Sequence, residues 1–392
     1  MKKPGPSLAS VLYCPLCGKD YSLHSIQHFA TCCNQPLLVR YLIKTPLPDI
    51  FVGRESGMWR YFEMLPLADF NHIISLGEGM TPIVSLKRLA SQYGFDQLLM
   101  KDESQNPTGS FKSRGISVAL SKAMELGIKR FIMPSAGNAG SALAAYSAHA
   151  GAECVVVMPR MSSRIFKEEC RLYGAKLIEV DGLIDDCAKT MMEINRDNHY
   201  FDLSTMKEPY RIEGKKTMGY EIFEQLDGVL PDYIVYPTGG GTGLIGIWKA
   251  FQEMKEMGWI KGKLPCMISV QSQSCASVEA AMHHPENWKE NFHAKPSIAE
   301  GLVVPQPFGM DLIQKVLKES EGTVISLPEN SIREAVKELA RAEGVLISPE
   351  GAAAWQGLKE LRQKKLIREN ATVLFLNTAS AHKYPEVLSL AR

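Results

Sequence analysis

The stretch that decides the fold is DYIVYPTGGGTGLIGIWKAF, residues 232–251. A short apolar run is followed by Gly239, Gly240 and Gly241, and then by apolar residues at three- and four-residue steps. This pattern predicts a buried strand that leads directly into an amphipathic helix. Consecutive glycines let backbone N–H groups crowd around an anion, and the helix dipole adds a favourable potential. We therefore predict a phosphate site at this turn.

The glycine turn fits neither common nucleotide motif. A Walker loop requires Gly-Lys-Ser/Thr after the turn, and this sequence has none. The turn also fits neither the glycine spacing nor the downstream acidic residue of a dinucleotide fingerprint. The alternative is a tight turn that binds nothing. The strand before the turn and the helix after it favour the phosphate site.

Other short apolar runs alternate with helical patterns along the chain. Strands are predicted at 97–103, 130–135, 153–159, 176–180, 266–271 and 372–377, and helices at 116–126 and 139–150. This alternation predicts an α/β fold in which parallel sheets are covered by helices. Ligands of such sheets bind beyond the carboxyl ends of the strands, so the residues that follow each strand are the candidates for function.

Composition limits the class of protein. The chain has 392 residues, of which 45% are hydrophobic, enough for two packed lobes and a small appendage. Lys and Arg total 44 against 43 Asp and Glu, so we expect neither a nucleic-acid nor a membrane partner. No run is long enough for a membrane span or a signal-peptide core. Nine cysteines, an odd number, suit a reducing compartment, which predicts the cytoplasm.

A lysine lies at the junction that follows the first of these strands. The sequence KDESQNPTGSFKSRG, residues 101–115, leaves a strand and enters a helix near Phe111. Lys112 then lies close to the ligand crevice and to helix-terminal N–H groups, surroundings that lower its pKa and suit imine formation. The alternative is a solvated lysine in an ordinary first helical turn.

Two further junctions carry polar residues. Ser135, Gly137 and Asn138 precede a helix of small residues, whose free N–H groups suit a substrate carboxylate, while the Asn138 amide could reach a ligand hydroxyl. The alternative is a simple helix cap. Thr378 follows the last predicted strand and offers a hydroxyl to the same crevice.

Together these pieces resemble the fold-type II pyridoxal-phosphate enzymes and, within them, the threonine synthase family. LGEGMTP at 76–82 is similar to that family's entry motif, and NPTGSFKSRG at 106–115 to its cofactor-lysine motif. EPYRIEGKKTMGYE at 208–221 is similar to its phosphohomoserine-binding stretch. The resemblance covers nearly the whole chain, and its motifs occur in the family's order.

The resemblance implies a tryptophan synthase β-like architecture of two lobes with parallel-rich sheets flanked by helices. Residues 46–112 and 216–392 would form a large domain that binds pyridoxal 5'-phosphate, and residues 113–215 a small mobile domain. The family's habit of dimerising predicts a homodimer.

Roles follow residue by residue from the resemblance. Lys112 would hold the cofactor as a Schiff base and move protons between the α and β carbons of the substrate. Asn138 would hold the ring 3-hydroxyl and Thr378 would face the pyridine nitrogen, where a neutral hydroxyl favours elimination and replacement over transamination. The cofactor phosphate would be held by Gly239, Gly240, Gly241, Thr242 and Gly243. The substrate contacts would be Ser135, Gly137 and Arg211, whose guanidinium suits a phosphate monoester.

The implied reaction is loss of phosphate from O-phospho-L-homoserine and addition of water to give threonine. Alternatives are β-replacement on O-phospho-L-serine, as in cysteate synthase, and a threonine/serine dehydratase. A catalytically silent binding protein of the same fold is the alternative outside the enzymes, and Arg211 as a surface salt-bridge partner is the alternative to a phosphate ligand. Ser113, Ala136 and Ala139 depart from the family pattern, so the cofactor contacts follow it more closely than the substrate contacts.

Residues 1–45 resemble a degenerate zinc ribbon found in some threonine synthases. Cys14 and Cys17 form a Cys-x-x-Cys pair, but Ala30 stands where the third cysteine is expected, and Cys32 directly precedes Cys33. Structural zinc needs four tetrahedral ligands, and neighbouring cysteines are a poor pair for that purpose. We expect a metal-free remnant and assign no metal ligand; His28 is the substitute ligand if one is needed.

Overall fold

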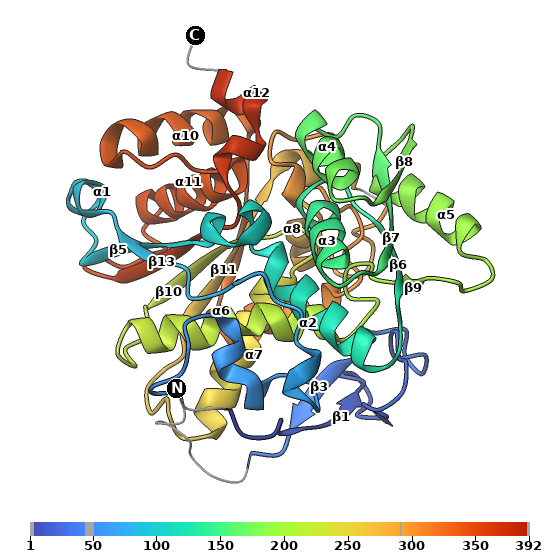
Figure 1. The fold of residues 1–392 in the computed structure, drawn as a ribbon. Coiled ribbons are helices and arrows are strands. Elements are labelled where there is room, and N and C mark those ends of the chain that lie inside the picture. Colours follow the sequence, from blue (N-terminus) through green and yellow to red (C-terminus); the bar gives the residue numbers. More distant parts are fainter. Residues whose placement is uncertain (1–3, 44–50, 291, 390–392) are drawn as a thin grey trace.

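The computed structural model describes residues 4–43, 51–290 and 292–389. Within them the chain forms three sheets (Figure 1). The predicted boundary between residues 45 and 46 lies outside the described residues. No helix among the described residues is long and apolar enough to cross a membrane.

The largest sheet has six strands in the order β12-β11-β10-β13-β5-β4. Their bounds are β4 (Ile83–Ser85), β5 (Gln97–Asp102), β10 (Tyr233–Pro237), β11 (Cys266–Ser272), β12 (Thr323–Leu327) and β13 (Thr372–Asn377). All pair in parallel except β4, which is antiparallel to β5. The central strands β10 and β13 are almost entirely buried, as expected for a parallel sheet covered on both faces.

Helices cover this sheet, and together they form what we call the large lobe (Figure 1). They are α1 (Lys87–Tyr93), α2 (Lys112–Glu125), α6 (Tyr210–Gln225), α7 (Thr242–Glu256), α8 (Ser277–His283), α9 (Met310–Glu319), α10 (Glu329–Glu343), α11 (Pro349–Gln363) and α12 (Pro385–Leu388). Helices α6 and α7 are buried along most of their length, whereas α10 is amphipathic and buries one side only. The predicted helix at 116–126 begins four residues earlier, at Lys112.

A second, fully parallel sheet has four strands in the order β8-β7-β6-β9. Its strands are β6 (Arg130–Pro134), β7 (Glu153–Pro159), β8 (Lys176–Val180) and β9 (Phe201–Asp202). With α3 (Asn138–His149), α4 (Arg164–Leu172) and α5 (Ile184–Ile194) it forms what we call the small lobe. The predicted fold class, two lobes with parallel-rich sheets flanked by helices, is confirmed; the exact domain boundaries and the mobility of the small lobe stay predictions.

The N-terminal segment, residues 4–43, forms a small antiparallel sheet that we call the cap. Its strands β1 (Ala9–Tyr13), β2 (Asp20–Tyr21) and β3 (Leu38–Tyr41) are arranged in the order β2-β1-β3. The cap joins the large lobe through the buried Tyr41 hydroxyl, which donates to the Glu213 carboxylate in α6 (2.8 Å).

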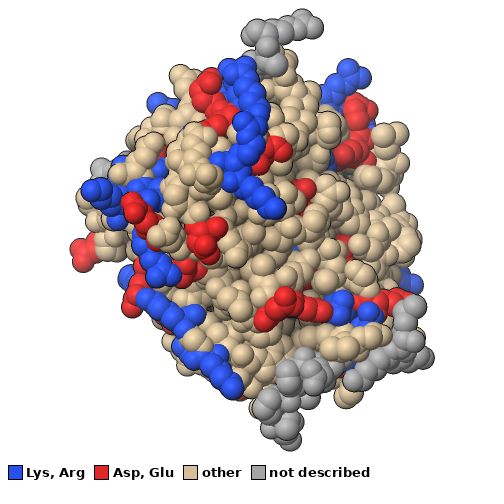
Figure 2. All heavy atoms as spheres, turned by 90° about the vertical axis from the view of Figure 1, so that its left-hand side faces the viewer, with Lys and Arg blue, Asp and Glu red and all other residues tan. Residues whose placement is uncertain are grey.

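Charged side chains of both signs are interspersed on the side of the molecule that carries α1 and α10 (Figure 2). Several form ion pairs there, such as Lys337 with Glu334 (3.0 Å) and Lys359 with Glu338 (2.5 Å). This mixed surface agrees with the nearly equal numbers of acidic and basic residues in the sequence.

Candidate active site

The candidate residues gather at one edge of the six-stranded sheet. Strands β5 and β13 run in parallel and end in register, with Asp102 opposite Asn377. The loops beyond β5, β10 and β13 therefore start from one edge, which brings together residues that are far apart in sequence.

A short backbone pairing positions Lys112 beside Thr378. The Phe111 N–H donates to the Thr378 carbonyl (3.0 Å), and the Ser380 N–H donates to the Gly109 carbonyl (2.8 Å). Lys112 follows immediately as the first residue of α2. The turn before the helix thus carries the amine to the end of β13.

The pKa of Lys112 is lowered to about 7. Burial disfavours the charged amine most, and the Arg211 guanidinium lowers the pKa further, whereas the Glu350 carboxylate raises it. A substantial fraction of Lys112 is therefore a neutral amine at physiological pH. That is the form that attacks an aldehyde, so the position suits imine formation.

A hydrogen-bonded chain lies on another side of the cavity. Asn138, the first residue of α3, donates from Nδ2 to the Tyr384 hydroxyl (2.9 Å), which in turn donates to Oε1 of Glu350 (2.9 Å). Asn138 Oδ1 is buried and has no protein partner. Burial raises the pKa of Glu350. Sequence reasoning found Asn138 but missed Tyr384 and Glu350, because nothing in their local sequence marks them.

The glycine turn sits between β10 and α7 as predicted. Gly241 has φ +79°, a left-handed conformation that favours glycine, and it precedes Thr242 at the start of the helix. A Cβ on Gly239 would lie 2.3 Å from the Gly301 carbonyl oxygen, so no larger residue fits there. The turn exposes helix N–H groups where the sequence predicts a phosphate.

One cavity connects most of the predicted cofactor residues. Its walls include Lys112, Asn138, Gly239, Gly240, Gly241, Thr242 and Thr378, together with Tyr384 and Glu350. Gly243 is in α7, one residue beyond Thr242, and a Cβ on it would clash with the Tyr236 hydroxyl rather than face the cavity.

Arg211, the second residue of α6, is buried. Its Nη1 donates to the Leu203 carbonyl (2.7 Å), its Nε is buried without a partner, and no carboxylate lies within ion-pair distance among the described residues. Burial lowers its pKa, although the Glu208 and Asp202 carboxylates oppose the effect. The alternative of a surface salt bridge is therefore wrong. A buried guanidinium with an unused donor is suited to an anionic ligand.

Ser135 and Gly137 lie outside the cavity lining. The Ser135 hydroxyl accepts hydrogen bonds from the N–H groups of Gly140 (2.8 Å) and Gly137 (3.2 Å), so it fastens the turn that leads into α3. This is the helix-cap arrangement considered as the alternative. Contact of these residues with a substrate carboxylate stays a prediction.

With this geometry in view, a family model described as pyridoxal-phosphate dependent enzyme matches residues 74–379. The chain belongs to this family. Curated relatives place it with the threonine synthases: it is 32% identical to threonine synthase of Methanocaldococcus jannaschii, across 95% of this chain and 93% of that protein. It is also 33% identical to threonine synthase of Methanosarcina acetivorans, across 96% of this chain and 93% of that protein.

Solved structures share the fold at lower identity. O-ureido-L-serine synthase superposes with a TM-score of 0.65 at 21% identity, covering 78% of this chain and 90% of that chain. Diaminopropionate ammonia lyase from Escherichia coli superposes with a TM-score of 0.68 at 19% identity, covering 81% and 89%. These likenesses support the architecture of this family member.

The residues present fit the family's cofactor, pyridoxal 5'-phosphate. Asn138 Oδ1, which has no partner among the described residues, offers a hydrogen-bond acceptor inside the cavity, and Gly239, Gly240 and Gly241 line the same cavity without side chains. Lys112 supplies the amine for the aldehyde. Thr378 lines the cavity from the end of β13, where its hydroxyl could face a ring nitrogen.

Lys215 anchors the turn before Lys112, a contact that the sequence did not indicate. It is fully buried on α6, donates to the Phe111 carbonyl and lies 4.3 Å from the centre of the Phe111 ring; Lys112 Nζ lies 4.4 Å from the same ring. No carboxylate among the described residues pairs with Lys215. Burial lowers its pKa well below the usual value, and the charges of Lys112 and Arg211 lower it further. The repeated lysine in the 208–221 motif was its only sequence signal.

Arg114 is a second missed residue. It is fully buried two residues after Lys112 and pairs with Glu103 (2.6 Å) and with Glu221, which also pairs with Lys101 (2.8 Å). This network ties α2 to β5 and α6. It fixes the helix whose first residue is Lys112.

The cap brings four cysteines together. One sulfur atom from each of Cys14, Cys17, Cys32 and Cys33 lies within 4.8 Å of the others. The adjacent Cys32 and Cys33, expected to be a poor pair, both reach this cluster, because the turn before β3 presents both thiols to the Cys14-x-x-Cys17 turn. His28 is not part of the cluster; its ring stacks on Phe201 at 4.9 Å.

Proposed function

We propose that this chain is a threonine synthase, a carbon–oxygen lyase that releases phosphate from O-phospho-L-homoserine and adds water at the β carbon to give L-threonine. The observation that carries the proposal is the buried Arg211, which has no carboxylate partner in the part of the chain that the structure describes and lies close enough to Lys112 to lower its pKa. A phosphorylated amino acid supplies the anion that this guanidinium lacks. The identity of 32–33% to threonine synthases supports the same substrate.

Binding is divided between two places in the cavity region. The N–H groups at Gly239, Gly240, Gly241 and Thr242 bind the cofactor phosphate at the start of α7, aided by the helix dipole. Asn138 Oδ1 accepts from the ring hydroxyl. Arg211 binds the substrate phosphate, and N–H groups between Ser135 and Asn138 bind the substrate carboxylate. Gly243 supports the turn from within α7.

Lys112 performs the proton transfers. When bound, the cofactor supplies an electron sink that acidifies the hydrogens on the substrate α and β carbons. Lys112 Nζ, with its pKa near 7, can accept and return protons at neutral pH without a large cost in either direction. The Thr378 hydroxyl is neutral, so it leaves the sink milder than a carboxylate would and favours elimination over transamination.

The proposed small mobile lobe also has a role here. We expect the small lobe to close over the cavity when substrate binds. Its closure excludes water while phosphate leaves, before one water molecule is admitted to the β carbon.

One alternative shares the same observation. Arg211 would bind the phosphate of O-phospho-L-serine as well, so a β-replacement enzyme fits the guanidinium equally. The dehydratases use an unphosphorylated substrate and leave Arg211 without an anion. A binding protein without activity would have no need for a lysine whose pKa is lowered to about 7, as that of Lys112 is. A homodimer and a cytoplasmic location stay predictions.

The deciding experiment measures phosphate release from O-phospho-L-homoserine and from O-phospho-L-serine, with the amino-acid product identified by chromatography. The proposal predicts equal amounts of phosphate and threonine from the first compound, and little release from the second. Release only from O-phospho-L-serine would contradict it. Ammonia and a keto acid from threonine would instead identify a dehydratase.

A further inference from the structure

The cap contains a thiol cluster with the dimensions of a metal site. Its four sulfur atoms lie within 4.8 Å of one another, and Cys17 Sγ and Cys32 Sγ are 3.4 Å apart. Zinc–sulfur bonds of about 2.3 Å in a tetrahedron place the sulfur atoms about 3.8 Å apart. The cluster therefore needs only small shifts to close around an ion.

The chemistry of the cluster selects the ion. All four donors are thiols, and none of them is in a disulfide. Soft thiolate ligands in a closed set of four favour zinc over magnesium or calcium, which prefer oxygen. We propose that Cys14, Cys17, Cys32 and Cys33 bind one zinc ion, and that this ion holds the cap against both lobes.

The loop that zinc would fix contacts both lobes. His28 lies in this loop, between Cys17 and Cys32 in the sequence, and its ring stacks on Phe201 of the small lobe with 4.9 Å between the ring centres. The next residue, Phe29, packs edge-on against Phe308 of the large lobe at 5.4 Å.

A further bond to the large lobe lies just beyond the cluster. Gln35, two residues after Cys33, donates to Asp311 in α9 (2.7 Å). The cap thus touches both lobes within a few residues of the cysteines.

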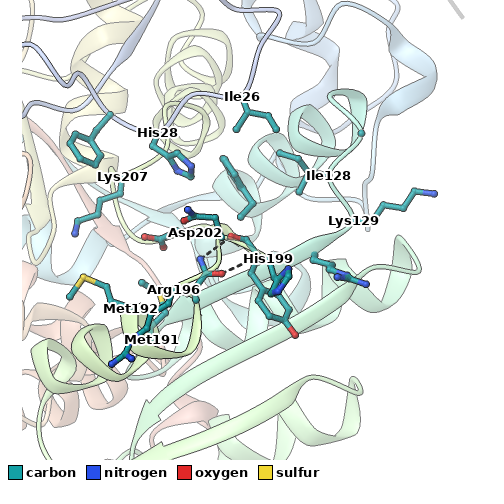
Figure 3. A pocket seen from close by; sticks show the side chains of 17 residues that line it. Ile26, His28, Ile128, Lys129, Met191, Met192, Arg196, His199, Asp202 and Lys207 are labelled. Atoms are coloured by element: carbon teal, nitrogen blue, oxygen red, sulfur yellow. Dashed lines mark hydrogen bonds between the residues drawn. The ribbon is translucent and has the colours of Figure 1, made fainter.

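An open space lies on one side of this loop. A hollow of about 840 Å³ lies between the cap and the small lobe, with Ile26 and His28 on one wall and residues 199–202 on the other (Figure 3). His28 and Phe201, which stack on each other, both line this space. A bound ion would supply the order that a packed core supplies elsewhere.

The contacted segments lead to the cofactor and substrate sites. Phe201 belongs to β9, and the carbonyl of Leu203, just beyond that strand, accepts the hydrogen bond from Arg211. Two residues after Leu203, Thr205 lies against Gly240: a Cβ added to Gly240 would be 3.0 Å from Thr205 Cγ2.

The other lobe offers a parallel route. Asp311, which accepts from Gln35, is the second residue of α9, and Ile313 in the same turn lies against Gly241. The cap therefore supports the elements behind Gly240 and Gly241 from both sides. Loss of zinc releases both supports, so it weakens cofactor and substrate binding more than it slows turnover.

The metal site is tested by elemental analysis and by replacing zinc with cobalt. We expect one zinc per chain, and visible bands of tetrahedral cobalt thiolate when Co²⁺ is added to protein stripped of zinc. Cys32→Ser and Cys17→Ser should abolish the cobalt thiolate bands, whereas Cys266→Ser, outside the cluster, should keep them. Absence of the bands in the unaltered chain, or their survival in Cys32→Ser, would overturn the proposed site.

The clamping role has a separate test. His28→Ala should keep its zinc but raise the Kd for pyridoxal 5'-phosphate and the KM for the phosphorylated substrate at least about fivefold, as zinc removal does, with a smaller change in kcat. The cofactor Kd is measured by absorbance without turnover, so it remains informative even if the substrate differs. An unchanged cofactor Kd after zinc removal and in His28→Ala would overturn the clamp.

Discussion

The chemistry of Lys112 depends on two charges of opposite sign. Arg211 lowers its pKa and Glu350 raises it, around a value of about 7. Only the neutral amine forms an imine, so the rate at which the cofactor-free protein takes up pyridoxal 5'-phosphate should rise with pH and reach half its maximum near pH 7. The growth of the imine absorbance measures this rate.

Substitution of the two charged residues provides the control for this pH dependence. Arg211→Met removes a positive charge, which raises the pKa of Lys112 and moves the midpoint to higher pH. Glu350→Gln removes a negative charge and moves the midpoint to lower pH. Shifts of the same sign in both variants would show that these groups do not act on Lys112 through their charge.

Arg211 itself should act on the substrate. Arg211→Ala leaves the substrate phosphate without its charged partner. The transition state should lose about 2 kcal/mol or more of binding free energy, so kcat/KM for O-phospho-L-homoserine should fall roughly 30-fold or more. Arg196→Ala, an exposed arginine of the small lobe, is the matched control and should leave kcat/KM unchanged. Equal kcat/KM values in the two variants would place the substrate phosphate elsewhere.

At the scale of single elements, α6 carries two neighbouring lysines with different surroundings. Lys216 pairs with Glu213 (2.8 Å) and Glu253 (3.1 Å), whereas the one hydrogen-bond partner of the Lys215 amine among the described residues is the Phe111 carbonyl. Lys216→Met strips a buried ion network of a cation and should destabilise the fold by about 3 kcal/mol. Lys215→Met should leave the melting temperature unchanged or higher, yet lower kcat because the residue before Lys112 loses its anchor. A large fall in melting temperature for Lys215→Met would show a purely structural role.

The turn between β10 and α7 gives a second test of this kind. A Cβ on Gly239 would lie 2.3 Å from the Gly301 oxygen, while a Cβ on Gly262 meets nothing within 4 Å. Overpacking at this depth costs about 1–3 kcal/mol. Gly239→Ala should therefore raise the cofactor Kd at least about tenfold, as measured by absorbance titration, and Gly262→Ala should not change it.

At the scale of the whole molecule, the sequence predicted the strands and helices whose apolar residues form a clear run or a regular repeat. Strands such as β10 and β13 are continuous apolar runs. The loops that follow β5, β10 and β13 bring Lys112, the glycine turn and Thr378 to one cavity. The prediction did not include β4 or β12. Strand β4 has three residues, none of them buried, and β12 carries Thr323 and Ser326 among its five residues, which interrupt the apolar run.

Residues that depend on long-range contacts were also missed. Glu350 and Lys215 belong to the site because α11 and α6 pack beside it, and their local sequences resemble any helix. The sequence also did not predict the cysteine cluster, for the same reason. The adjacent positions of Cys32 and Cys33 argued against a shared site, but the folded turn brings both sulfur atoms close to those of Cys14 and Cys17. Local patterns located the strand ends, whereas tertiary packing selected these residues.

The central claim is that the Lys112 amine carries pyridoxal 5'-phosphate. The most direct measurement is reduction of the cofactor-loaded protein with borohydride, followed by proteolysis and mass spectrometry of the peptides. A pyridoxyl phosphate adduct on the peptide that contains Lys112, absent from Lys112→Ala, is the predicted result. An adduct on another lysine, or none on a protein incubated with excess cofactor, would contradict it.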